Sequence, residues 1–80
     1  MDIRVRVGKN LRRLRRAQGW SQEEFAYIAG YHRTYISGIE RGIRNPTVVI
    51  LDKIAAALEI PAWRLLDDGS AEIPAEDRAP

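Results

Sequence analysis

Basic side chains dominate the groups of this sequence that could do chemistry, and their distribution favours anion binding. The 80 residues include 13 Lys and Arg against 11 Asp and Glu, with a formal net charge of +2. Residues 1–64 hold 12 of the basic but only six of the acidic residues, a net +6, whereas residues 65–80 carry a net −4. A basic body with a short acidic tail suits a polyanionic partner. The alternative is that these charges belong to solvated helix faces.

Groups for catalysis or metal binding are sparse. His32 is the only histidine and there is no cysteine, so neither a metal site nor a catalytic base is predicted, and no disulfide framework can form. The sequence has no clustered nucleophile–base set and no phosphate loop. We therefore expect that the protein is not an enzyme and that it needs no cofactor. Apolar runs such as residues 48–51 are too short to cross a bilayer. With no apolar signal segment at the N-terminus, we expect a cytoplasmic protein without a membrane partner.

The elements that must carry these side chains are all predicted to be helices. A first helix is predicted because an apolar stripe at helical spacing lies opposite an arginine-rich side. The stripe consists of Ile3, Val7, Leu11 and Leu14. We expect this helix to end near Gly19. A second helix opens at Ser21, since Glu24 follows at the capping-box distance, and it ends at Gly30. Its predicted inner face consists of Phe25, Ala26, Ile28 and Ala29.

Three more helices follow, which gives an all-α fold. Ile36 and Ile39 lie on one face of a helix predicted from Arg33 to Arg41. Asn45-Pro46 breaks the chain, and Thr47 can cap a fourth helix that runs to Leu58. Pro61 fits the first turn of a brief fifth helix that ends at Leu66. We expect one domain over residues 1–66 and a disordered acidic tail over residues 67–80.

The second and third helices, with the tight turn at Gly30 between them, predict a helix-turn-helix. A close crossing requires a small residue in the first helix, a turn residue that tolerates positive φ, and a branched apolar anchor in the second helix. With Gln22 counted as one, Ala26, Gly30 and Ile36 stand at positions five, nine and fifteen. Together they match this requirement.

Four segments extend this similarity over much of the chain: GWSQEEFA (19–26), RTYISGIERG (33–42), RNP (44–46) and IAAAL (54–58). With them the sequence resembles the Xre-type helix-turn-helix family of lambda-repressor-like proteins, from about Val7 to Leu66. Residues 33–42, in so short a chain, are most similar to the controller proteins of restriction–modification systems. The resemblance implies a compact five-helix lambda-repressor-like domain whose third helix lies in the major groove of double-stranded DNA.

The resemblance also implies which side chains contact DNA. Base reading falls on Arg33 and Thr34, with Tyr35 and Ser37 beside them, and Arg33 could donate two hydrogen bonds to a guanine. Phosphate contacts fall on Gln22, Arg41, Arg44 and Asn45, which would fix the register of the protein on DNA. The alternative for this second group is ordinary surface charge. Gly38 stands where the family often has a reaching side chain, so either a reader is missing or the backbone can approach closely.

Other positions are implied to have architectural roles. Arg15 and Glu40 occupy positions that in this family can pair as a partly buried salt bridge between the first and third helices. Val49, Ile50 and Trp63 stand where polar residues are usual, which favours a subunit interface; alternatively they complete a small core. We expect Trp20 to pack against Phe25, and His32 to be a turn residue at the helix cap.

The expected function is therefore sequence-specific regulation of transcription by a homodimer on a palindromic operator, as in a restriction–modification controller. RNA polymerase is a further expected partner, blocked or recruited by the bound dimer. The alternatives are a phage-type repressor, and an antitoxin that neutralises a toxin and binds its own operator. A neighbouring methyltransferase or endonuclease gene would favour the controller, and a neighbouring toxin gene would favour the antitoxin.

Overall fold

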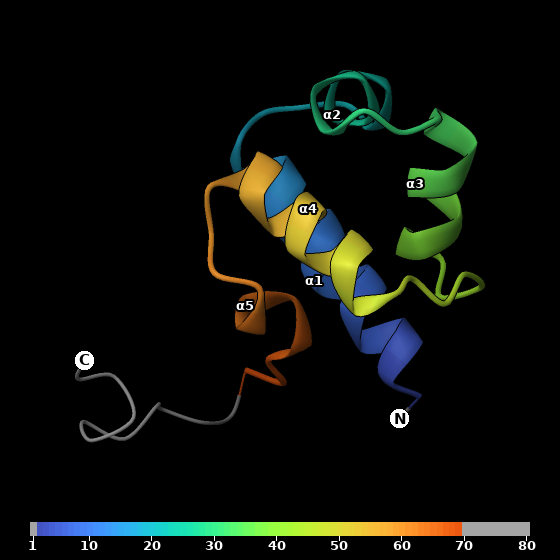
Figure 1. Ribbon diagram of the computed structural model, residues 1–80, viewed down its shortest axis with the longest axis vertical. Coiled ribbons are helices and arrows are strands. Elements are labelled where there is room, and N and C mark those ends of the chain that lie inside the picture. Colours follow the sequence, from blue (N-terminus) through green and yellow to red (C-terminus); the bar gives the residue numbers. More distant parts are fainter. Residues whose placement is uncertain (1, 70–80) are drawn as a thin grey trace.

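The computed structural model describes residues 2–69, and these residues form five helices without a strand (Figure 1). The all-α prediction with five helices is confirmed. α1 packs against α3 and α5, while α2 packs against α3 and α4. In Figure 1, α2 and α3 occupy the upper and right edges of the molecule, and α5 lies at the lower left. The bounds are α1 Ile3–Ala17, α2 Gln22–Ala29, α3 Arg33–Glu40, α4 Val48–Leu58 and α5 Trp63–Leu66.

Side-chain caps fix where the helices begin. At α2, Ser21 Oγ accepts from the backbone N–H of Glu24 at 3.0 Å, and Glu24 Oε1 accepts from the N–H of Ser21 at 2.9 Å. The capping box is therefore confirmed. Thr47 Oγ1 caps α4 by accepting from the N–H of Ile50 at 3.1 Å, as predicted. These bonds satisfy backbone donors that the first turn of a helix leaves without partners.

The core lies where the apolar faces of all five helices meet. Its fully buried side chains are Leu11, Phe25, Ile36, Ile39, Ile54, Leu58 and Leu65. Burial of one such side chain contributes about 1.5–3 kcal/mol. Gly8 lets α1 approach the end of α3, because a Cβ there would overlap the carbonyl oxygens of Ile39 and Glu40. The core thus fixes α3 against α1 and leaves the opposite side of α3 exposed.

The prediction that Ile28 faces inward is wrong, and Ile3 of the predicted apolar stripe also lies outside the core. Ile28 is 46% exposed, because it lies roughly 100° around α2 from the middle of the face that Phe25, Ala26 and Ala29 bury. Ile3 is also 46% exposed. It lies in the first turn of α1 and lines a small apolar hollow with Leu51 and Leu66 instead of entering the core.

Smaller differences concern the ends of the helices. α3 ends at Glu40, and Arg41 is its cap. α5 begins at Trp63, so Pro61 precedes the helix and is not in its first turn, which corrects the prediction. No helix within residues 2–69 has both the length and the apolar content to cross a membrane. The predicted tail falls mostly on residues 70–80, outside the described residues, so the domain boundary stays a prediction.

Candidate nucleic-acid interface

The turn between α2 and α3 sets the angle at which α3 leaves the body. Gly30 has φ 82°, and its N–H and that of Tyr31 both donate to the carbonyl of Ala26 at 2.9 Å. Such paired bonds end a helix when the residue after it is left-handed, a conformation that favours glycine. Ala26 is 3% exposed and Ile36 fully buried. The three residues that predicted this motif therefore form the crossing itself.

The N-terminal end of α3 presents polar side chains to solvent. Arg33 and Thr34 are exposed, Tyr35 and Ser37 are half-buried, and Ile36 fills the core on the other side. Arg33 Nε lies 3.9 Å from Glu23 Oε1, and both side chains are more than half exposed. A surface ion pair of this kind contributes about 0–1 kcal/mol, so Arg33 can leave it for a stronger acceptor.

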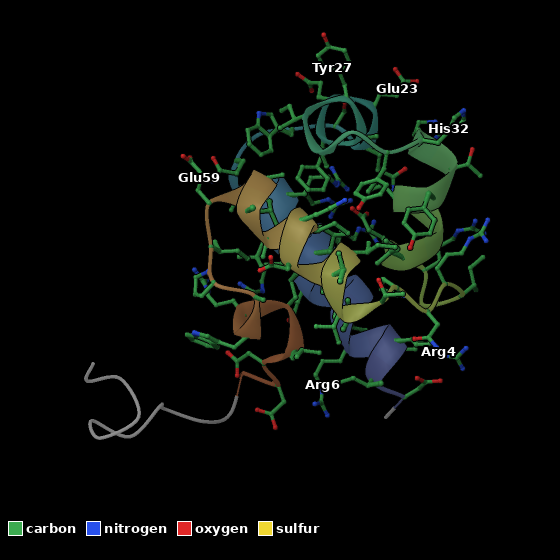
Figure 2. The ribbon with its side chains drawn as sticks, in the orientation of Figure 1. Arg4, Arg6, Glu23, Tyr27, His32 and Glu59 are labelled. Carbon is green, nitrogen blue, oxygen red and sulfur yellow. The ribbon has the colours of Figure 1, made fainter. Side chains whose placement is uncertain are left out.

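Figure 2 shows how this end of α3 is placed in the molecule. Glu23 of α2 and His32 at the start of α3 lie at the same upper edge, whereas Arg4 and Arg6 lie at the opposite end. His32 caps α3, because its Nδ1 accepts from the N–H of Thr34 at 3.4 Å. His32, the residue expected in this turn, is therefore an exposed helix cap with a long hydrogen bond.

Gln22 belongs to a partly buried polar network around Glu40, a place in the fold that the sequence did not predict for it. Its Nε2 donates to Glu40 Oε1 at 3.0 Å. Glu40 also accepts from Arg15 Nε at 2.6 Å and Arg15 Nη2 at 3.0 Å, while Arg15 Nη1 donates to the carbonyl of Trp20 at 2.7 Å. The structure thus brings together the predicted pair Arg15 and Glu40, whose side chains are 7% and 3% exposed.

This network leaves Gln22 able to contact an anion. An amide NH₂ has two hydrogens, and the bond to Glu40 uses only one of them. The side chain is also restrained at the N-terminus of α2, where exposed backbone N–H groups and the helix dipole favour negative charge. An open hollow lies at this point, and the residues that line it are four arginines, two polar residues and one acid: Arg12, Arg15, Arg16, Arg33, Ser21, Gln22 and Glu23. The arginines outnumber the single carboxylate of Glu23, so the hollow can hold a phosphate between α1, α2 and the start of α3 if Arg33 turns from Glu23 to the phosphate.

The C-terminal end of α3 and the following loop carry the remaining predicted contacts. Arg41, Arg44 and Asn45 are all exposed. The Arg44 guanidinium lies over the Tyr35 ring, 5.7 Å from its centroid. Burial raises the pKa of the Tyr35 hydroxyl, the charge of Tyr31 adds to this and that of Arg44 opposes it. Tyr35 therefore stays a neutral hydrogen-bonding group at physiological pH.

Several apolar side chains of α4 and α5 are exposed to solvent. Val49 is 63% and Trp63 46% exposed, while Ile50 is half-buried against the core. Val48, which the sequence did not single out, is 81% exposed. Trp20 stacks on Phe25 with ring centroids 6.0 Å apart, as predicted. Within residues 2–69 there is no group of three or more side chains suited to hold a metal.

The fold and this site define the class: a five-helix domain with a helix-turn-helix whose second helix presents its N-terminal end to solvent. Residues 11–62 match the family described as helix-turn-helix. The chain belongs to this family, and the predicted Xre-type relationship is confirmed.

The relatives with similar sequence or structure include transcriptional regulators and restriction–modification controllers. An HTH-type transcriptional regulator of Sinorhizobium fredii is 48% identical over 60 residues, which covers 75% of this chain and 78% of the relative. The restriction–modification controller protein C.AhdI of Aeromonas hydrophila has a similar structure, with TM-score 0.74 and 45% identity over 78% of this chain and 94% of the controller. The controller C.Esp1396I, a tetramer on its natural 35-base-pair operator, aligns with TM-score 0.71 and 38% identity over 76% of this chain and 80% of its own.

Proposed function

We propose that this protein is a homodimeric, sequence-specific DNA-binding regulator of transcription of the restriction–modification controller type. The observation that carries the proposal is the exposed N-terminal end of α3. There Arg33 and Thr34 stand free of the core next to the basic hollow at the start of α2. A helix presented in this way can enter the major groove while the hollow receives a backbone phosphate.

Each predicted contact has a defined task in this proposal. Arg33 donates to O6 and N7 of a guanine, and Thr34, Tyr35 and Ser37 contact neighbouring base edges. Gln22 donates to a phosphate together with the N-terminal amides of α2. Arg41, Arg44 and Asn45 contact the backbone beyond the other end of α3. The phosphate contacts supply affinity and register, and the base contacts supply sequence preference.

Dimerisation is proposed through the exposed apolar surface of α4 and α5. A two-fold axis there would present two α3 helices to successive major grooves, about 34 Å apart, and require a palindromic site. Similarity to a controller that is a tetramer on its operator supports binding by more than one copy of the chain. Regulation would then follow from where the bound dimer blocks or recruits RNA polymerase. In this role the protein binds DNA and catalyses no reaction.

Selection of bound sequences from a random pool of DNA duplexes tests the proposal. We expect a palindromic consensus with a guanine in each half-site, and half-sites one helical turn apart. Arg33→Ala should relax the preference at that guanine, whereas Arg6→Ala, a matched loss of charge at the far end of the molecule, should leave the consensus unchanged. Recovery of a pool without enrichment would contradict the proposal.

A further inference from the structure

Gly38 and Arg44 are in contact in a way that neither the fold nor the proposed function requires. Gly38 lies buried in the middle of α3, with no side chain of its own. The Arg44 side chain occupies the space that a side chain at Gly38 would fill. A Cβ built on Gly38 would lie 2.7 Å from Arg44 Cγ and 3.2 Å from Arg44 Nε.

The backbone ties the same two residues together. The carbonyl of Gly38 accepts from the N–H of Ile43 at 3.0 Å and from the N–H of Arg44 at 3.3 Å. The turn that brings the loop back includes Gly42, with φ 78°. A Cβ at Gly42 would lie 3.0 Å from Cγ2 of Val5 in α1. The loop after α3 is therefore folded back onto the helix at Gly38.

The Arg44 side chain passes over Gly38 and ends at an aromatic ring. Arg44 Cζ lies 5.7 Å from the centroid of the Tyr35 ring, within the range of a cation–π contact. Tyr35 is itself held by Tyr31, with ring centroids 5.5 Å apart and planes tilted by 41°. The guanidinium is thus fixed along α3, beside the residues proposed to face bases.

We infer that Gly38 is a positioning residue for Arg44: its missing side chain opens the path by which a loop arginine lies across α3 and stacks on Tyr35. The protein thereby holds a fixed positive charge on the DNA-facing side of α3, where it contacts a backbone phosphate. This inference rests on the proposed function for the DNA contact, but not for the geometry. An alanine at position 38 would push away Cγ, near the root of the Arg44 side chain, so the whole side chain must swing off Tyr35.

NMR of the free protein tests the geometry without DNA. The ring current of Tyr35 should shift the Arg44 side-chain resonances upfield. We expect this shift to persist in Tyr35→Phe, which keeps the ring, and to vanish in Tyr35→Leu and in Gly38→Ala. Helix propensity favours alanine over glycine, so Gly38→Ala should stay folded, which the remaining spectrum will show. An unchanged Arg44 shift in Gly38→Ala or Tyr35→Leu would overturn the inference.

The salt dependence of DNA binding tests the consequence. Loss of one phosphate contact lowers the slope of log affinity against log salt by about 0.9, or about eightfold in affinity between 1 M and 0.1 M salt. We expect this loss in Arg44→Ala and equally in Gly38→Ala, and no further loss in the double variant. Arg41→Ala, which removes a neighbouring charge, should add fully to Gly38→Ala.

The two tests separate the inference from the proposed function. Full additivity of Gly38→Ala with Arg44→Ala would overturn the positioning role even if the protein binds DNA. If the unmodified protein binds no duplex, the proposed function fails, and the DNA-contact part of the inference fails with it. The NMR shifts then still decide whether Gly38 positions Arg44.

Discussion

At the scale of single residues, the position of Gln22 shows what a sequence pattern can and cannot predict. Family resemblance predicted a phosphate contact for this glutamine at the start of α2. The hydrogen bond from its Nε2 to Glu40, 18 residues away in the chain, had no local signal in the sequence. It depends on how α2 crosses α3, which only the folded chain defines. The same is true of Arg44 and Tyr35, which the turn at Gly42 brings together.

Gln22→Ala should weaken binding to every duplex by a similar factor. The variant loses a phosphate donor and keeps all proposed base contacts, so affinity falls without a change in preference. Binding titrations against a specific and a scrambled duplex at one fixed salt concentration measure this. Gln22→Asn, which shortens the amide, is a conservative comparison and should fall in the same direction. A loss confined to the specific duplex would contradict the phosphate assignment.

At the scale of helices, the sequence predicted the number, order and most ends of the elements, because their signals are local. Capping residues, helix-ending glycines and the apolar period lie within a few residues of what they determine. Errors arose where one helix face had to be chosen without knowledge of its neighbours. Ile28 and Ile3 both stand at positions whose helical spacing is compatible with burial. In the structure, however, no other element fully covers their side chains.

Loss of one partner of the Arg15–Glu40 ion pair between α1 and α3 should destabilise the fold more than loss of both. Arg15→Met leaves the Glu40 carboxylate buried without its cation, which should lower the free energy of unfolding by about 3–5 kcal/mol. Arg15→Met combined with Glu40→Met should recover most of this loss, since no buried charge is left uncompensated. Urea denaturation followed by circular dichroism measures both variants. A double variant no more stable than Arg15→Met would show that the charges do not act as a pair.

The capping box of α2 should make a pH-dependent contribution to stability. The hydrogen bond from the backbone of Ser21 lowers the pKa of Glu24 below its ordinary value of 4.5. A carboxyl with a lowered folded pKa stabilises the fold above its unfolded pKa, and this contribution is lost as pH falls through the folded pKa. The melting temperature of the unmodified protein should therefore exceed that of Glu24→Gln near pH 7. We expect the gap to narrow as pH falls below the ordinary pKa of a glutamate and to close once pH is below the lowered pKa of Glu24. A gap independent of pH would contradict this role.

At the scale of the whole molecule, α4 and α5 carry apolar side chains that are exposed within the described residues. Val48, Val49 and Trp63 are too exposed to contribute fully to the core. This exposure supports the proposed subunit interface, which stays a prediction. Ile50 is intermediate, because it packs against the core and is still partly exposed. The sequence could indicate this surface only by comparison with polar residues at the same positions in relatives.

Val49→Asp should weaken self-association without unfolding the monomer. A carboxylate at a site 63% exposed is well solvated in the monomer but would lose water in an apolar interface. Analytical ultracentrifugation over a range of concentrations measures the dimer dissociation constant, and circular dichroism checks the fold. Lys53→Ala, an exposed substitution on the same helix, serves as a comparison. A dimer equally stable in Val49→Asp would place the interface elsewhere.

The most direct test of the central claim, that the start of α3 reads bases, combines a protein variant with a DNA variant. In a selected operator, the conserved guanine of each half-site is replaced by 7-deazaguanine, which lacks the N7 acceptor in the major groove. The account predicts about tenfold weaker binding by the unmodified protein, and no further weakening for Arg33→Ala, which has already lost this contact. Equal losses for both proteins, or no loss for either, would contradict it.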